Sequence, residues 1–134
     1  MIKKIYFHAD DFGRSKLISK NIYKCVQFGI INSISIIVGF DENYFEKIKK
    51  HRNLNIKLHL NLTENSKKSL LKKNYSFLKL LLLRFSLNHV EQKRIIKNEI
   101  ERQIIYFKNK FKIKKIQIDS HEHIHVIPWI NDII

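Results

Sequence analysis

The chain has 134 residues, a hydrophobic content of 44% and a formal net charge of +14 at pH 7. This length favours a single domain, residues 1–134, with enough apolar side chains for a buried core. The single cysteine, Cys25, excludes an internal disulfide framework, and its apolar neighbours predict that it is buried. The chain has neither an apolar run long enough to cross a bilayer nor the apolar stretch of a secretory signal, which favours a cytoplasmic location.

The positive charge raises the alternative of a basic module that binds nucleic acid. Only five of the 26 basic residues are arginines, the residue favoured for gripping phosphates, and the lysines are spread along the whole chain. The sequence also lacks a motif of basic and aromatic residues for stacking bases. We therefore interpret the charge as a general bias toward lysine and expect no nucleic-acid partner.

The spacing of apolar residues predicts alternating strands and helices. Apolar runs bounded by polar residues indicate strands, and apolar residues three or four apart indicate helices. In chain order these are a strand ending near residue 10, a helix around 18–26, a strand at 33–38, a short helix near 41–48, a strand at 56–62, a helical stretch at 77–85, a helix at about 89–110 and a strand at 113–119. This order is typical of an α/β fold with parallel strands and right-handed crossovers.

Two of the predicted helices begin with capping signals. Asp41 is placed to cap the short helix, and Asn88 with Glu91 has the spacing of a capping box at the start of the long helix. The predicted inward face of the long helix consists of Val90, Ile95, Ile100, Ile104 and Phe107.

Residues 117–125, with the sequence QIDSHEHIH, contain three of the seven histidines at alternate positions. In an extended strand, alternate side chains point the same way. Asp119, His121, His123 and His125 would then share one side, as a candidate set of metal ligands.

Side chains that can bind metals follow three of the predicted strands. Asp10 and Asp11 end the first strand, His59 and Asn61 end the third, and Asp119 begins the polar end of the fourth. The carboxyl ends of parallel strands meet at one edge of a sheet, so we expect these groups to lie together. Adjacent carboxylates on a strand face opposite sides, which would let one bind a metal ion while the other takes a proton.

Five segments together resemble the YdjC-like, or ChbG/HpnK-type, carbohydrate deacetylases. They occur in the family's order, and their joint occurrence is specific, whereas any one of them alone would be weak. The segments are HADDFGRS at 8–15, GIINSIS at 29–35, LHLNLT at 58–63, EIERQIIYF at 99–107 and IDSHEHIHVIP at 118–128.

The resemblance implies a divalent metal ion held by Asp11, His59 and His121, with Asp10 as the general base. The implied reaction removes the acetyl group from an N-acetylated sugar, such as a chitooligosaccharide or a glycolipid head group. Family members are commonly assigned magnesium, and two imidazoles with one carboxylate suit zinc or another transition metal equally. His125 is our candidate for protonating the leaving amine, and Asp119 for fixing the tautomer of a ligand histidine.

The sequence departs from the family pattern at two places. His8 stands where relatives often carry asparagine, and the lysine-rich connection after Thr63 lacks the usual glycine and proline signals. The resemblance also covers only about the N-terminal half of a typical member.

Four strands cannot close an eight-stranded barrel. The expected fold is therefore the first half of a (β/α) barrel of the polysaccharide-deacetylase-like type, apparently truncated. An open sheet edge predicts an aggregation-prone or homodimeric protein. Because the sugar-positioning groups and the cavity walls are expected mostly from the other half of the barrel, the chain should bind a divalent ion weakly and deacetylate slowly or not at all. Another metal-assisted hydrolase, such as a phosphoesterase, is the alternative enzyme.

Overall fold

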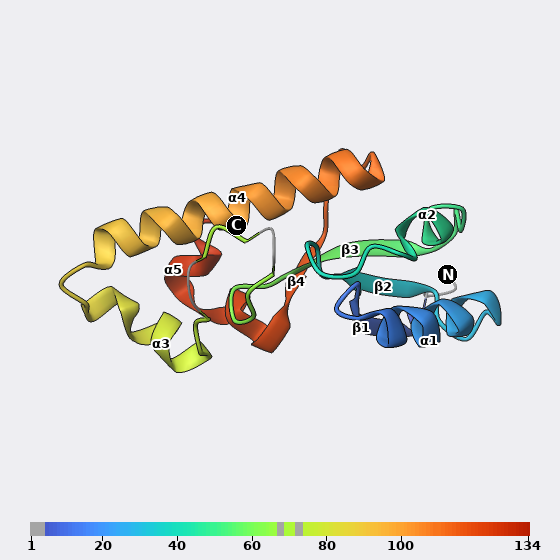
Figure 1. Ribbon diagram of the computed structural model, residues 1–134, viewed down its shortest axis with the longest axis horizontal. Coiled ribbons are helices and arrows are strands. Elements are labelled where there is room, and N and C mark those ends of the chain that lie inside the picture. The colour runs from blue at the N-terminus through green and yellow to red at the C-terminus, as the bar shows by residue number, and fades with distance from the viewer. Residues whose placement is uncertain (1–4, 67–68, 72–73) are drawn as a thin grey trace.

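The computed structural model describes residues 5–66, 69–71 and 74–134. Its centre is a parallel sheet of four strands in the order β1-β2-β3-β4 (Figure 1). The strands are β1 (His8–Phe12), β2 (Ser33–Ile36), β3 (Asn55–Leu60) and β4 (Ile118–Ser120). Sequential strands are neighbours and all three pairings are parallel, so the predicted α/β fold is confirmed.

Helices occupy each connection between the strands. They are α1 (Lys16–Gln27), α2 (Phe45–Ile48), α3 (Phe77–Leu82) with the 3₁₀ turn η1 (Leu83–Phe85), and α4 (His89–Phe111). After β4 come η2 (His121–Val126) and α5 (Pro128–Asn131). None of the described helices combines the length and the apolar character that crossing a membrane requires.

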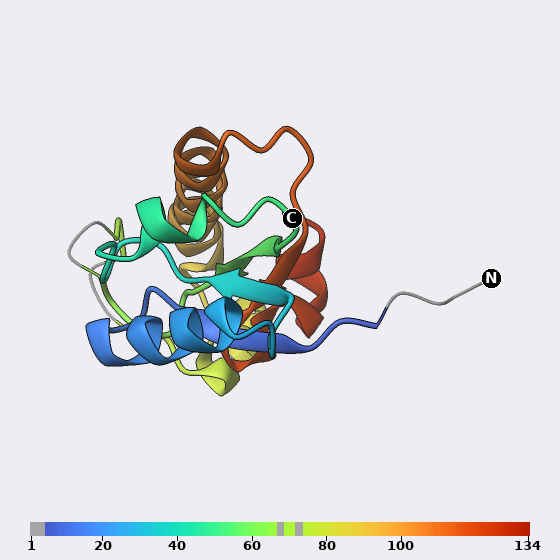
Figure 2. The same ribbon diagram turned by 90° about the vertical axis from the view of Figure 1, so that its right-hand side faces the viewer.

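The two faces of the sheet differ in polarity. On one face, Ile34, Ile36 and Leu58 are fully buried in a cluster with side chains of α1, α2 and α4, and Figure 2 shows these three helices on the same side of the strands. The alternate residues, among them Ser35 and His59, lie on the other face and form a hydrogen-bonded polar surface. The chemistry described below lies on this polar face.

Several local predictions are corrected by the structure. Asp41 does not cap α2, which begins after Tyr44 without a side-chain cap, and Asn88 is the N-cap residue of α4 but makes no capping hydrogen bond with its side chain. Val90 is 70% exposed, although the other four residues predicted on that helix face pack inward. Cys25 is only partly buried. The lysine pairs 67–68 and 72–73 of the predicted lysine-rich connection lie outside the described residues.

The prediction that the histidine-rich tract is an extended strand is wrong. β4 ends at Ser120, and the chain then enters η2, where Glu122 and His123 have left-handed φ values of 53° and 54°. The turn buries Ile124 completely in the core cluster around α3, α4 and α5. Burial of that isoleucine therefore overrides the period-two histidine pattern.

Candidate metal centre

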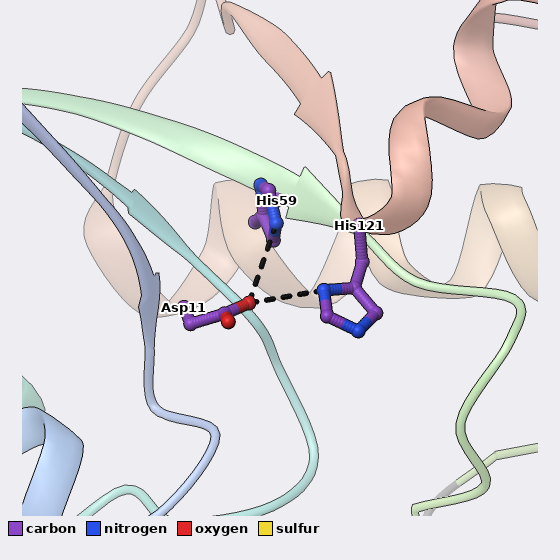
Figure 3. A group of neighbouring side chains, drawn as sticks. All are labelled: Asp11, His59 and His121. Carbon is purple, nitrogen blue, oxygen red and sulfur yellow. Dashed lines mark ion pairs between the residues drawn. The ribbon is translucent and has the colours of Figure 1, made fainter.

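Three potential metal ligands from separate parts of the chain converge beside the carboxyl ends of the strands (Figure 3). Asp11 comes from β1, His59 from β3, and His121 follows directly after β4. The carboxylate oxygen Asp11 Oδ1 lies 3.4 Å from His59 Nε2 and 3.1 Å from His121 Nδ1. One ligand atom from each of the three residues lies within 4.8 Å of the other two.

Asp11 reaches this position through an irregularity in β1. The register between β1 and β2 shifts between Ala9 and Phe12, and Asp11 adopts a left-handed φ of 65°. The bulge turns Asp11 toward the two histidines while Asp10 faces the polar surface beside Ser35. The prediction that the two carboxylates face opposite sides of the strand is wrong, because the bulge places both of them on the polar face, Asp11 toward the histidines and Asp10 toward Ser35.

The ligand oxygen of Asp11 is an unusual buried group. Among the side-chain atoms of the described residues, Asp11 Oδ1 is buried without a hydrogen bond, because neither nearby imidazole has hydrogen-bond geometry toward it. A buried unpaired carboxylate oxygen is costly unless a cation compensates it. Bonds of about 2.1 Å to a shared ion would place ligand atoms about 3.0–3.4 Å apart, and Asp11 Oδ1 lies at 3.4 Å and 3.1 Å from the two histidine nitrogens. These residues therefore fit a divalent metal ion.

His59 is oriented by a carboxylate on its other ring nitrogen. Its Nδ1 lies 2.6 Å from Asp119 Oδ1, so an Nδ1–H donor leaves Nε2 free to face Asp11. Burial by itself raises the pKa of the Asp119 carboxyl, but the hydrogen bond from His59 and the nearby His8 outweigh it, and the net pKa is lowered. The sequence prediction that Asp119 could fix a histidine tautomer agrees with this geometry.

His121 faces a carboxylate that sequence reasoning missed. Its Nε2 lies 3.6 Å from Glu64 Oε1, on the side of the ring opposite Asp11. Glu64 pairs through both oxygens with Arg14, whose Nη1 also donates to Asp11 Oδ2 at 3.1 Å. The hydrogen bonds to Glu64 raise the pKa of the Arg14 guanidinium. Arg14 thus holds one oxygen of Asp11 and leaves the other turned toward the histidines.

Asn61 supports the loop beside the site and does not belong to the ligand cluster. Its side-chain oxygen accepts from the backbone N–H groups of Thr63 and Glu64, and its amide donates to the Glu64 carbonyl. The buried side chain of Gln103 in α4 bonds both the N–H and the C=O of Asn61. This network fixes the loop that carries Glu64.

Asp10 belongs to a second group of polar side chains on the same face of the sheet. Its Oδ1 accepts from the Ser35 hydroxyl at 2.8 Å and lies 3.0 Å from His8 Nε2. The Asp10 side chain is 57% exposed, so water can reach it. His8 Nε2 also lies 3.4 Å from Asp119 Oδ2, which connects this group to the His59 pair.

The two remaining histidines of the tract do not join the described ligand cluster. His125 is held by Ser120, whose hydroxyl lies 2.6 Å from His125 Nδ1 and accepts from its backbone N–H. His123 is exposed, with its ring centroid 6.3 Å from that of His125. The catalytic role of His125 stays a prediction.

Comparisons with known proteins agree with the sequence motifs. A family model described as YdjC-like protein matches residues 4–134. The chain is 28% identical to a carbohydrate deacetylase from Vibrio parahaemolyticus and 29% identical to one from Brevibacillus brevis, covering 98% of this chain and 53% and 54% of those proteins. It is 28% identical to a chitooligosaccharide deacetylase from Serratia marcescens, over 100% of this chain and 55% of that protein.

A similar fold occurs in a crystal structure from Enterococcus faecalis V583, of a protein assigned provisionally to cellobiose-phosphate cleavage. The TM-score is 0.67 at 21% identity, and the match covers 94% of this chain and 51% of that one. The chain thus spans about half the length of the curated relatives that it matches.

Proposed function

We propose that this chain, which belongs to the YdjC-like family, binds a divalent metal ion and serves the removal of an acetyl group from an N-acetylated carbohydrate. The observation that carries the proposal is Asp11 Oδ1, buried without a hydrogen bond between the imidazoles of His59 and His121. The similar proteins named carbohydrate and chitooligosaccharide deacetylases supply the substrate class.

The residues around the ligands prepare the site for hydrolysis. A bound divalent ion would polarise the acetyl carbonyl and make water more acidic. Asp119 and Glu64 hold the two imidazoles with their ligand nitrogens toward Asp11. Arg14 fixes the other oxygen of the Asp11 carboxylate, so less conformational freedom is lost when the ligands close on an ion.

Asp10 is the proposed general base. Its carboxylate is accessible to water, and the Ser35 hydroxyl donates to one of its oxygens, which restricts its orientation. From this position it would take the proton of the attacking water. We propose His125 for protonation of the leaving amine, because Ser120 engages only its Nδ1 and leaves Nε2 for the substrate.

The donor set leaves the choice of ion to experiment. Two nitrogens and one oxygen suit Zn²⁺ or another transition ion, while Mg²⁺ is the ion implied by the family resemblance. Titration calorimetry of the metal-free chain with each ion is the direct test. Asp11→Asn, His59→Ala and His121→Ala should each weaken binding by more than about tenfold. His51→Ala is the matched control, since His51 packs beside the ring of Tyr23 instead. Equal affinity in all four variants would refute the ligand assignment.

The reaction class is tested separately from metal binding. Acetate release from N-acetylated chitobiose should depend on Asp10, and Asp10→Asn should lower turnover about 10²- to 10⁴-fold while the affinity of the Asp11, His59 and His121 site for metal persists. His125→Gln should likewise lower turnover without loss of metal affinity. Release of phosphate from sugar phosphates, with no acetate from any N-acetylated sugar, would favour the phosphoesterase alternative instead.

A further inference from the structure

We propose that His8, Asp10 and Asp119 form a second, weaker site for a divalent transition-metal ion. One ligand atom from each of these residues lies within 4.8 Å of the other two. His8 Nε2 lies 3.0 Å from Asp10 Oδ1 and 3.4 Å from Asp119 Oδ2, which is the spacing of ligand atoms around one ion. The Ser35 hydroxyl, 3.3 Å from His8 Nε2, adds a fourth polar atom.

The orientation of His8 suits metal binding. Its Nδ1 lies 2.7 Å from Ser33 Oγ, on the side of the ring away from the two carboxylates. Ser33 Oγ has two acceptor lone pairs, so it can accept from His8 Nδ1–H as well as from Asn55 Nδ2 at 3.2 Å. In that tautomer, Nε2 presents its lone pair to an ion between Asp10 and Asp119.

The local charge balance favours a divalent cation. Within the described part of the chain, the ion pairs of Asp10 and Asp119 are made with histidines only. Arg14, the guanidinium nearby, is already paired with Asp11 and Glu64. A protonated His8 would compensate one of the two carboxylates, whereas a divalent ion compensates both.

Asp119 links the two sites without being shared as a ligand. Its Oδ1 is bound to His59 Nδ1, and its Oδ2 faces His8. The group of His8, Asp10 and Asp119 is more open to solvent than the group of Asp11, His59 and His121, since the side chains of Asp10 and Asp119 are 57% and 26% exposed. Solvated ligands bind an ion less tightly, so we expect the second site to fill after the first.

The second site has a consequence that depends on the proposed function. If Asp10 is the general base, an ion bound to its carboxylate competes with the proton. Excess metal ion would then inhibit hydrolysis that stoichiometric metal ion supports. Whether the ion binds is independent of this consequence and is tested by itself.

The test is titration of the metal-free chain with Co²⁺, in which binding is measured by calorimetry and by the visible absorption of the bound ion. The wild-type chain should bind two equivalents of Co²⁺. His8→Ala should bind one, because the affinity of the second site falls by at least about tenfold. His51→Ala is the matched control and should keep two. Asp11→Asn should lose the first equivalent and retain the second. The urea midpoint of each variant shows that it is folded.

The possible outcomes separate this proposal from the first metal site. Suppose the wild-type chain binds one equivalent of Co²⁺, which His8→Ala still binds and Asp11→Asn does not. That result would overturn the second site and leave the first intact. Two equivalents in His8→Ala would also overturn it. A single equivalent lost in His8→Ala and kept in Asp11→Asn would support the second site and refute the first.

Discussion

Gly13 offers a sharp test of how the backbone positions Asp11. Its φ of 94° lies in the left-handed region, and an added Cβ would lie 2.4 Å from the Ile37 carbonyl oxygen and 3.0 Å from the Phe45 ring. Left-handed backbone costs an L-residue about 1–2 kcal/mol. Overpacking against the buried neighbours adds about 1–3 kcal/mol. Gly13→Ala should therefore lower the free energy of unfolding by about 2–5 kcal/mol in total.

Gly29→Ala is the matched control for this substitution. Gly29 has a φ of 70°, but a Cβ at that position would meet nothing within 4 Å. The control therefore carries only the backbone cost, about 1–2 kcal/mol. Urea unfolding of both variants, with the slope compared to that of the wild-type chain, isolates the difference.

The same pair of variants tests the link to the metal site. A shift of the backbone at Gly13 displaces Asp11, two residues earlier, whereas Gly29 lies beyond the end of α1. Gly13→Ala should weaken divalent-ion binding in calorimetry, and Gly29→Ala should not. Equal destabilisation by the two substitutions, or equal metal affinity, would show that the close approach of Gly13 to Ile37 is not what holds this turn.

Three further predictions concern the polar groups around the site. Gln103→Met removes three hydrogen bonds of a buried amide, so it should lower the free energy of unfolding in urea by about 2–4 kcal/mol. The control, Asn98→Ala on the exposed side of α4, should change that free energy by no more than about 0.5 kcal/mol. Arg14→Lys cannot reproduce the planar fork and should weaken divalent-ion binding about tenfold in calorimetry, whereas the exposed Arg52→Lys should leave it unchanged. Because the pKa of Asp119 is lowered in the folded chain, its contribution to stability is present above the unfolded pKa of about 3.9 and lost as pH falls through the folded value. The wild-type chain should therefore be more stable than Asp119→Asn at pH 6, and the difference between their urea midpoints should shrink as the pH falls below about 3.9. A difference that stays constant over that range would contradict this.

The sequence by itself was sufficient for the α/β order and for the candidate ligands. Apolar periodicity is a local property, so it predicted the first three strands and the main helices near their observed positions. The fourth strand was predicted at 113–119 but begins only at Ile118. The rule that parallel strands end at one edge predicted that the acids and histidines at the ends of three strands lie together. Within that group, the family resemblance singled out Asp11, His59 and His121, which the structure brings together. The family resemblance, confirmed by the match over residues 4–134, rests on those same local motifs.

Only the tertiary structure decided which neighbours orient the ligands. Glu64 reaches His121 through a loop held by Gln103, 42 residues from Asn61, and no local pattern reports such a contact. The group of His8, Asp10 and Asp119 likewise depends on the pairing of β1 with β2 and of β3 with β4. The histidine tract turned away from the predicted strand because burying Ile124 in the core outweighed a pattern of polar side chains. Packing is a property of the whole chain, and it fixed what periodicity left open.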